Sequence, residues 1–158
     1  MFSSRCRRIL VGAVALAVSL VVVAPAHATV SATYGTLTST VPTVAACTGG
    51  TCMTTAASFA SNGTVSTNVT VTITLYRTAK AGATVASSTD YVVKRTSITY
   101  TTVKGTKSTK TLSASQKCLT VATVAYGYYT RATMTNGTTP GTVSENSTIK
   151  QLKGCATV

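Results

Sequence analysis

The cysteines are the residues of this sequence whose spacing first suggests chemistry. Cys47 and Cys52 enclose a Gly-Gly pair, whereas Cys118 and Cys155 stand alone. A structural zinc site needs Cys or His ligands in paired short spacings, and a thioredoxin-like redox motif has a shorter gap between its cysteines. We therefore expect no metal and no cofactor, and we interpret the four cysteines as disulfide partners.

The first 28 residues have the layout of a secretory signal peptide. Arginines at positions 5, 7 and 8 precede an apolar run over residues 9–24, and a small-residue site ends at Ala28. This order of charged, apolar and small residues is typical of a signal peptide, and the run is shorter than the roughly 20 residues of a transmembrane helix. We predict cleavage after Ala28, which leaves residues 29–158 as a single secreted, extracellular domain without a membrane anchor.

Export makes disulfide bonds the natural state of the remaining cysteines, because extracellular compartments are oxidising. Four cysteines allow three pairings. We favour Cys47 with Cys52 and Cys118 with Cys155, and the other two pairings stay open. A disulfide bond stabilises the fold by reducing the entropy of the unfolded chain. On this basis the bond that closes the longer loop contributes about 4 kcal/mol to stability, and the one that closes the shorter loop about 2 kcal/mol.

Composition and periodicity predict strands along the chain. Threonine and valine are abundant, and both fit a pleated strand better than a helix. The clearest strand is Asn68–Arg77, where apolar residues alternate with threonines at period two. A second is expected near Cys118–Met134, with residues to bury on both faces. Weaker candidates are Ala32–Ser39, Ala83–Ser87, Tyr91–Val103 with a break near Lys94 and Arg95, and Val143–Leu152.

Short strands separated by glycine and Asn-Gly turns predict an all-β fold. The expected architecture is a disulfide-stapled, two-sheet antiparallel β-sandwich that is Ig-like in general architecture. The immunoglobulin family itself is not indicated. The chain has no tryptophan, and Gln116 stands two residues before Cys118, where that family has a tyrosine.

Groups suited to catalysis are scarce. After cleavage the chain has no histidine, and its only acids are Asp90 and Glu145. General acid–base catalysis usually needs a histidine or a pair of carboxylates. Both acids stand among Ser, Thr and Asn residues that favour turns, so we interpret both as turn residues. We therefore expect a protein without enzymatic activity.

Positive charge is concentrated in the middle of the chain. No charged side chain occurs from Thr29 to Tyr76, whereas residues 77–117 carry a net charge of +7. Three lysines spaced three apart, Lys104, Lys107 and Lys110, are expected to fan out around one loop, and such clusters attract polyanions. The expected polyanion-binding residues are Lys94, Arg95, Lys104, Lys107, Lys110 and Lys117. The alternative is that these lysines only maintain solubility and protect edge strands.

A tyrosine-rich stretch is the other candidate binding surface. Tyr126 and Tyr128 share one face of a strand, and Tyr129 and Arg131 share the other. Either pair could stack against sugars or bases. The alternative is that the tyrosines pack against threonines of neighbouring strands.

These features predict a secreted, non-enzymatic binding module whose partner is an anionic polymer of the cell envelope. No motif for specific nucleic-acid binding is present. Three alternatives remain: a small-molecule carrier with a tyrosine-lined cleft, a self-assembling or protein-interaction module using the charge-free segment, and an inhibitor of an extracellular enzyme that presents the loop from Cys47 to Cys52. The oligomeric state is not indicated.

Overall fold

A computed structural model describes residues 27–119, 123–137, 141–153 and 155–156 of the chain. The predicted signal peptide lies outside these residues, except for its last two positions. The described residues form ten strands and no helix. The strands are β1 (His27–Ala32), β2 (Gly35–Thr40), β3 (Thr43–Cys47), β4 (Gly50–Ser61), β5 (Thr67–Ala81), β6 (Tyr91–Thr102), β7 (Ser108–Lys117), β8 (Tyr126–Thr135), β9 (Thr142–Asn146) and β10 (Lys150–Leu152).

The strands form two antiparallel sheets, each built around one long central strand. In sheet A, one edge of β4 pairs with β7. The other edge of β4 pairs with β2 along one part of its length and with β3 along the other, and β1 pairs with the outer edge of β2. In sheet B, β5 lies between β6 and β8, and β9 and β10 pair in succession with the far edge of β8. The all-β class and the two antiparallel sheets predicted from the sequence are confirmed.

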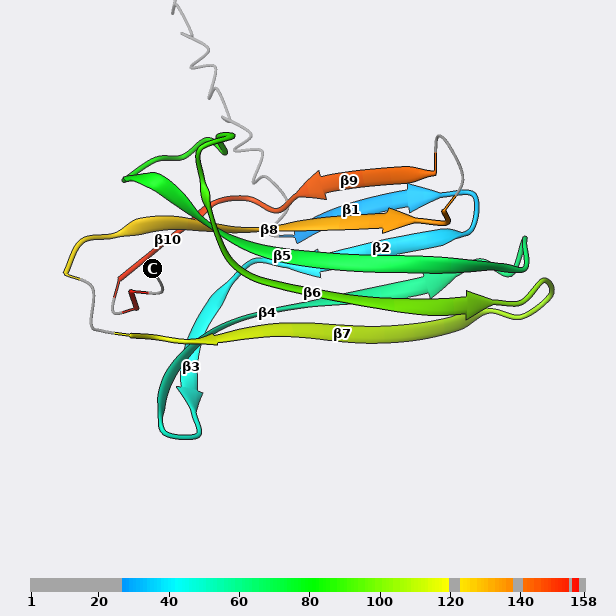
Figure 1. Cartoon of the computed structure of the whole chain (residues 1–158), viewed down its shortest axis with the longest axis horizontal. Coiled ribbons are helices and arrows are strands. Elements are labelled where there is room, and N and C mark those ends of the chain that lie inside the picture. The colour runs from blue at the N-terminus through cyan, green and yellow to red at the C-terminus, as the bar shows by residue number, and fades with distance from the viewer. Residues whose placement is uncertain (1–26, 120–122, 138–140, 154, 157–158) are drawn as a thin grey trace, which may run out of the picture.

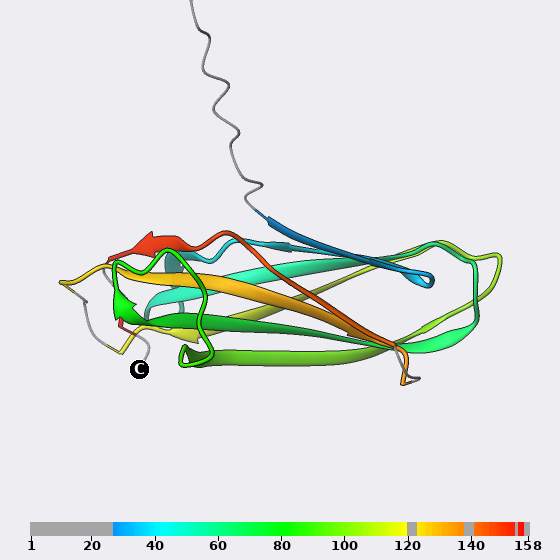
Figure 2. The same cartoon turned by 90° about the horizontal axis from the view of Figure 1, so that it is seen from above.

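The two sheets pack face to face, and their long strands run along the long axis of the molecule (Figures 1 and 2). The β6–β7 turn lies at one end of this axis, and the C-terminal segment lies at the other (Figure 1). This β-sandwich-like arrangement leaves each sheet with one inner face and one outer face.

Side-chain alternation explains which face of each strand is buried. In β5, Val69, Val71, Ile73 and Leu75 are fully buried and point inward, as the sequence predicts. The first three meet residues such as Phe59 from sheet A in the larger of two core clusters, and Leu75 meets Met53 in the smaller one. Each such side chain stabilises the fold by roughly 1.5–3 kcal/mol.

The disulfide bonds hold the end of the molecule that lies away from the β6–β7 turn. Cys47–Cys52 closes the β3–β4 hairpin, and Cys118–Cys155 links the end of β7 to the C-terminal segment. This is the pairing favoured from the sequence. Cys155 is fully buried in the smaller core cluster, where Tyr128 donates its hydroxyl hydrogen to the Cys155 carbonyl at 3.0 Å.

Four strand predictions differ from the structure. The strand expected near Cys118–Met134 begins only at Tyr126, because the Cys118 N–H bonds the Thr51 carbonyl and Leu119 bonds Ala156, which turns the chain away from sheet B. Residues 120–122 lie outside the described residues.

Residues 83–87 form a loop instead of a strand, since Gly82 has a positive φ of 71° and the N–H of Asp90 bonds back to the Ser87 carbonyl. The expected strand Ala32–Ser39 is divided by a turn between β1 and β2. The expected strand Val143–Leu152 is divided into β9 and β10 by residues 147–149, which belong to no strand.

The strand expected at Tyr91–Val103 is confirmed as β6, and its irregularity falls at Val93. Leu75 lies opposite Lys94 and Tyr76 lies opposite Val92, so Val93 is an extra residue in the ladder. Strands β3, β4 and β7 have no counterpart in the sequence-based prediction. The sequence of β7 shows why, because only Leu112 and Ala114 among its ten residues are buried.

Candidate functional site

The six basic residues predicted to bind polyanions separate into two groups. Lys104 and Lys107 flank the β6–β7 turn and Lys110 follows on β7; all three side chains are exposed. We call these three the turn lysines. The expectation that they share one loop is wrong for Lys110, which is paired with Phe59 in sheet A.

The other three lie toward the opposite end of the sandwich. Lys94 and Arg95 are near the start of β6, and Lys117 is the last residue of β7. Arg95 lies seven positions before Thr102, the end of β6 next to the turn, and Lys117 lies seven positions after Lys110 on β7. At the rise of a β-strand, each of these separations is roughly 23 Å. The Lys117 side chain instead lies beside the β3–β4 turn, where a Cβ on Gly49 would come within 3.2 Å of its Nζ. The six residues therefore do not form one patch.

The predicted tyrosine platform is closed by packing. Tyr128 points into the smaller core cluster and Tyr129 stacks on Tyr76 with ring centroids 5.0 Å apart; both are fully buried. Tyr126 packs against the guanidinium of Arg77, whose Cζ is 4.6 Å from the ring centroid. The fourth residue of the prediction, Arg131, is different, because it lies at the surface of sheet B.

The outer face of sheet B brings together two arginines that are distant in the sequence. In the strand register, Arg95 of β6 and Arg131 of β8 lie on either side of Thr74 of β5, and Asn146 of β9 lies beyond Arg131. Strands lie about 4.8 Å apart, so the two arginine Cα atoms are roughly 10 Å apart. A pocket of about 350 Å³ opens here, and we call its lining the arginine platform. Its lining residues are Thr72, Thr74, Tyr76, Arg95, Arg131, Thr133 and Ser144.

Both guanidinium groups are oriented by neighbours. The Nε–H of Arg131 donates to Asn146 Oδ1 at 2.9 Å, and its Cζ lies 5.3 Å from the centre of the Tyr76 ring. The Nε–H of Arg95 donates to Thr74 Oγ1 at 3.4 Å. Thr74 is only 4 % exposed. A guanidinium that is already fixed in this way loses less conformational entropy when it binds a ligand.

Tyr76 is supported from the side by Tyr129, its neighbour across the β5–β8 pair, which takes part in a hydrogen-bond network. Tyr129 stacks on Tyr76 and donates its hydroxyl hydrogen to Asp90 Oδ2 at 3.1 Å. Burial raises the pKa of Tyr129 well above its usual value, and the nearby Asp90 carboxylate raises it further. The phenol therefore stays protonated and continues to donate to Asp90.

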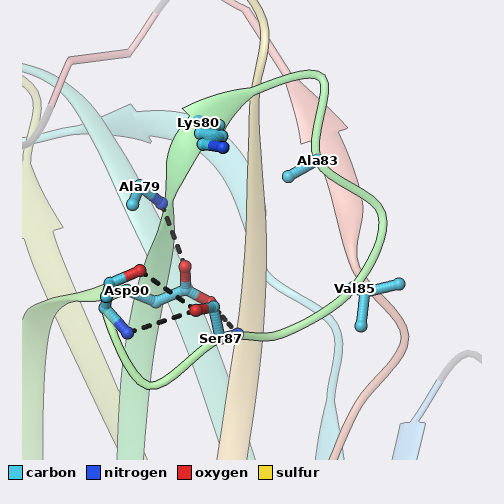
Figure 3. A pocket seen from close by; sticks show the side chains of 7 residues that line it. Ala79, Lys80, Ala83, Val85, Ser87 and Asp90 are labelled. Carbon is cyan, nitrogen blue, oxygen red and sulfur yellow. Dashed lines mark hydrogen bonds between the residues drawn. The ribbon is translucent and has the colours of Figure 1, made fainter.

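Asp90 has a structural position in the loop between β5 and β6. Its carboxylate accepts from the N–H of Ala79 at 3.0 Å and from the N–H of Ser87 at 2.8 Å (Figure 3). It also accepts from the hydroxyl of Tyr129. The prediction that Asp90 is a turn residue is confirmed. Asp90 also lines a hollow of about 270 Å³ with Val85 and other residues of this loop. Its oxygens are already engaged, so the carboxylate serves to close the loop.

Glu145 does not lie in a turn, so that prediction is wrong. It belongs to β9, opposite Ala132 of β8. With Arg131, Ser144 and Asn146 it lines a hollow of about 290 Å³ beside the arginine platform. Among the described residues, the platform's own lining includes no carboxylate.

Sequence reasoning found the two arginines but did not associate them. It also missed Tyr76, Asn146 and the hydroxyl residues Thr72, Thr74, Thr133 and Ser144 as members of a site. The alternation in β5 does indicate that Thr72, Thr74 and Tyr76 share the outer face. The partner strands of β5 were the missing information.

No protein-family model matches this chain, and no curated protein sequence matches it significantly. Within the described residues, no helix is long and apolar enough to cross a bilayer. The same residues contain no cluster of three or more His, Cys, Asp or Glu side chains arranged to hold a metal ion.

Proposed function

We propose that this protein is a secreted, non-enzymatic binding module for anionic polymers of the cell envelope or its surroundings. Residues 1–28 serve as its signal peptide, and residues 29–158 form one exported domain, Ig-like in general architecture. The two disulfide bonds support this location, because such bonds persist in oxidising compartments. Cleavage after Ala28 leaves Thr29–Ala32 of β1, which pair with Gly35–Thr38 of β2.

The charge of the exported chain carries the proposal. Residues 29–158 contain eleven Lys and Arg residues and two acids, a formal charge of +9. One of these acids, Asp90, uses its oxygens inside the protein. The turn lysines, Lys94, Arg95 and Lys117 are all exposed. A surface of this kind concentrates polyanions and binds them by releasing their counterions.

The test is binding of residues 29–158 to purified cell-wall polymer, with and without its anionic component, across a salt series. We expect binding that requires the anionic component, and a log affinity that falls linearly with log salt concentration. A variant with all three turn lysines changed to glutamate reports their share of the slope. Absence of binding at low salt, or binding that is indifferent to the anionic component, would overturn the proposal.

One observation favours a second candidate function, self-association through sheet A. Among the described residues, the outer face of sheet A carries one charged side chain, Lys117, which lies at the end of the sheet beside the β3–β4 turn. Its other side chains are uncharged and include Thr29, Ser31, Thr36, Thr38, Thr43, Thr54, Ala56, Ser58, Ala60, Thr109, Thr111, Ser113 and Ser115. Two copies of a basic protein meet with least repulsion at such a face. Sedimentation as a strict monomer at millimolar concentration would exclude this candidate.

A further inference from the structure

From the arginine platform we infer a specific subsite for an oxyanion carried on a hydroxyl-bearing chain, as in an acidic polysaccharide or a polyol phosphate. This inference rests on the proposed polyanion-binding function and deepens it. It replaces a general attraction between charges with a defined place of contact and a class of ligand. Three features of the platform support it.

The first feature is the orientation of Arg131. Its Nε–H is held by Asn146 and its guanidinium lies over the Tyr76 ring, so the group is fixed at the surface of sheet B. The bond to Asn146 uses only one of the guanidinium donors, and the two terminal nitrogens carry the others. A planar pair of such donors binds a carboxylate or phosphate through two parallel hydrogen bonds, which a lysine ammonium does not reproduce.

The second feature is the distance between the two arginines. Arg95 and Arg131 are two strands apart, with Thr74 between them. At roughly 10 Å between Cα atoms, both side chains reach either one oxyanion or two successive anionic groups of a polymer. Since the platform's lining in the described part of the chain lacks a carboxylate, an external oxyanion supplies the negative charge that the arginine pair attracts.

The third feature is the set of hydroxyl groups around the arginines. Thr72, Thr133 and Ser144 line the platform beside Thr74, and Thr72 already exchanges a hydrogen bond of 2.7 Å with Ser97. A hydroxyl both donates and accepts hydrogen bonds. Sugar and polyol units offer the same two capacities, whereas an anionic polymer without hydroxyl groups offers mainly acceptors. The platform therefore favours charges that are carried on hydroxylated units.

The outer face of sheet B also suits an extended ligand. The rows of hydroxyls continue along the strands beyond the platform, from Thr72 to Thr70 on β5 and from Thr133 to Thr135 on β8. Thr70 and Thr72 lie two residues apart, a spacing of roughly 7 Å along the strand. A polymer lying along β5 and β8 thus meets hydroxyl groups at regular intervals on leaving the arginines.

The experiment compares variants of residues 29–158 that lose the same charge at different places. Arg131→Gln and Arg95→Gln remove one charge from the platform, and Lys107→Gln removes one from the turn lysines as the matched control. Arg131→Lys keeps the charge but loses the planar donor pair. Each variant is titrated at one salt concentration with polygalacturonate, poly(glycerol phosphate) and polyglutamate, after a thermal melt verifies that it is folded.

We expect wild type to prefer the two hydroxylated polymers over polyglutamate. Arg131→Gln and Arg95→Gln should each weaken binding to the preferred polymer about tenfold, as loss of a charge-assisted contact does. Arg131→Lys should not restore binding, and Lys107→Gln should weaken it less than about threefold. A preference for polygalacturonate identifies a sugar carboxylate as the ligand, and a preference for poly(glycerol phosphate) identifies a polyol phosphate.

A charge-neutral variant tests the role of the hydroxyl groups independently. Thr133→Val keeps the shape of the side chain and removes its hydroxyl, so it should reduce the preference for hydroxylated polymers over polyglutamate. Equal losses for Arg131→Gln and Lys107→Gln would overturn the subsite and leave the proposed polyanion binding intact. Failure of wild type to bind any of the three polymers would overturn the proposed function itself.

Discussion

The outer faces of the two sheets start from the same pattern and end with different surfaces. In sheet A the central row across three strands is Thr38, Ser58 and Thr111, and in sheet B the corresponding row is Arg131, Thr74 and Arg95. The central strand contributes a hydroxyl residue in both rows. The difference comes from the two flanking strands, which add hydroxyls in one sheet and guanidinium groups in the other.

Support of the surface side chains by their neighbours also distinguishes the two faces. In sheet B, Tyr76 and Tyr129 stack at the end of the arginine platform, and Asp90 fixes Tyr129. Apart from Lys117 and the Cys47–Cys52 disulfide at one end, the outer face of sheet A is made of short hydroxyl and alanine side chains among the described residues. The comparison shows that alternation of Thr and Val builds the sheet, and that a few larger side chains from neighbouring strands turn one face into a candidate binding site.

The largest expected effect tests this support. Tyr129→Ala removes a fully buried ring and should lower the free energy of unfolding by about 4 kcal/mol, because a cavity remains where the ring was packed. Urea denaturation measures the change. Thr111→Ala on the outer face of sheet A is the control and should change stability by less than about 0.5 kcal/mol. A loss below about 1 kcal/mol for Tyr129→Ala would show that the two faces do not differ in their support.

A second variant attempts to convert sheet A into a copy of sheet B. Thr38→Arg combined with Thr111→Arg places two arginines on either side of Ser58. We expect a several-fold gain in affinity for anionic polymers and a salt dependence steeper by one to two units, since two phosphate or carboxylate contacts are added.

The converted face should prefer hydroxylated polymers less strongly than the arginine platform does, although it is rich in hydroxyl groups, because it has no equivalent of Asn146 or Tyr76 to orient its arginines. Thr38→Gln with Thr111→Gln is the uncharged control. A converted face as selective as the arginine platform would show that orientation is unnecessary, and that two arginines on a hydroxyl-rich strand are sufficient.

The Tyr129–Asp90 contact gives a pH dependence. The raised pKa of Tyr129 in the folded state means that folding opposes its ionisation. The stability that the protonated Tyr129 contributes to the folded state is fully present below the unfolded pKa of 10 and is lost as pH rises above that value. By pH 11 the loss is about 1 kcal/mol, since the stability changes by at most about 1.4 kcal/mol per pH unit.

Tyr129→Phe isolates this effect. At pH 7 the variant should be less stable than wild type by about 1–2 kcal/mol, because the hydrogen bond to Asp90 is lost. Thermal melts from pH 7 to pH 11 should show that the difference in stability between wild type and the variant becomes smaller above pH 10. A gap that stays constant would mean that Tyr129 does not oppose ionisation in the folded protein.

The smallest expected difference compares the two central strands directly. Thr74→Ala removes a nearly buried hydroxyl that accepts a hydrogen bond from Arg95, and should cost about 1 kcal/mol. Ser58→Ala at the matching position of sheet A should cost less than about 0.5 kcal/mol. Equal costs in urea denaturation would indicate that Arg95 makes no stabilising contact with Thr74.

The sequence predicted the strands whose pattern is strong and missed those whose pattern is weak. β5 alternates fully buried apolar residues with threonine, so its period of two is unmistakable. β7 has only Leu112 and Ala114 as buried positions, and pairing with β4 over its whole length makes it a strand. Cys118 has strand-like neighbours, but its N–H bonds the Thr51 carbonyl of sheet A, and the strand of sheet B begins only at Tyr126.

The candidate site was predictable only in its parts. Arg95 and Arg131 were recognised, one as a member of a lysine cluster and the other as a partner of Tyr129. The structure separates Arg95 from the turn lysines by most of the length of β6, and brings it near Arg131 across β5. The predicted lysine loop was inferred from spacing alone, and spacing does not show where the turn ends and β7 begins.

The sequence by itself determined that the chain is all β, that one face of β5 carries hydroxyl groups, and that positive charge greatly exceeds negative charge. These properties depend on the period of two along a strand and on simple composition, which are local. Only the tertiary structure decided that β6 and β8 flank β5, in a register that aligns Arg95, Thr74 and Arg131. Strand pairing depends on contacts between residues far apart in the chain, and a register shifted by one residue would turn these side chains to the opposite face of the sheet.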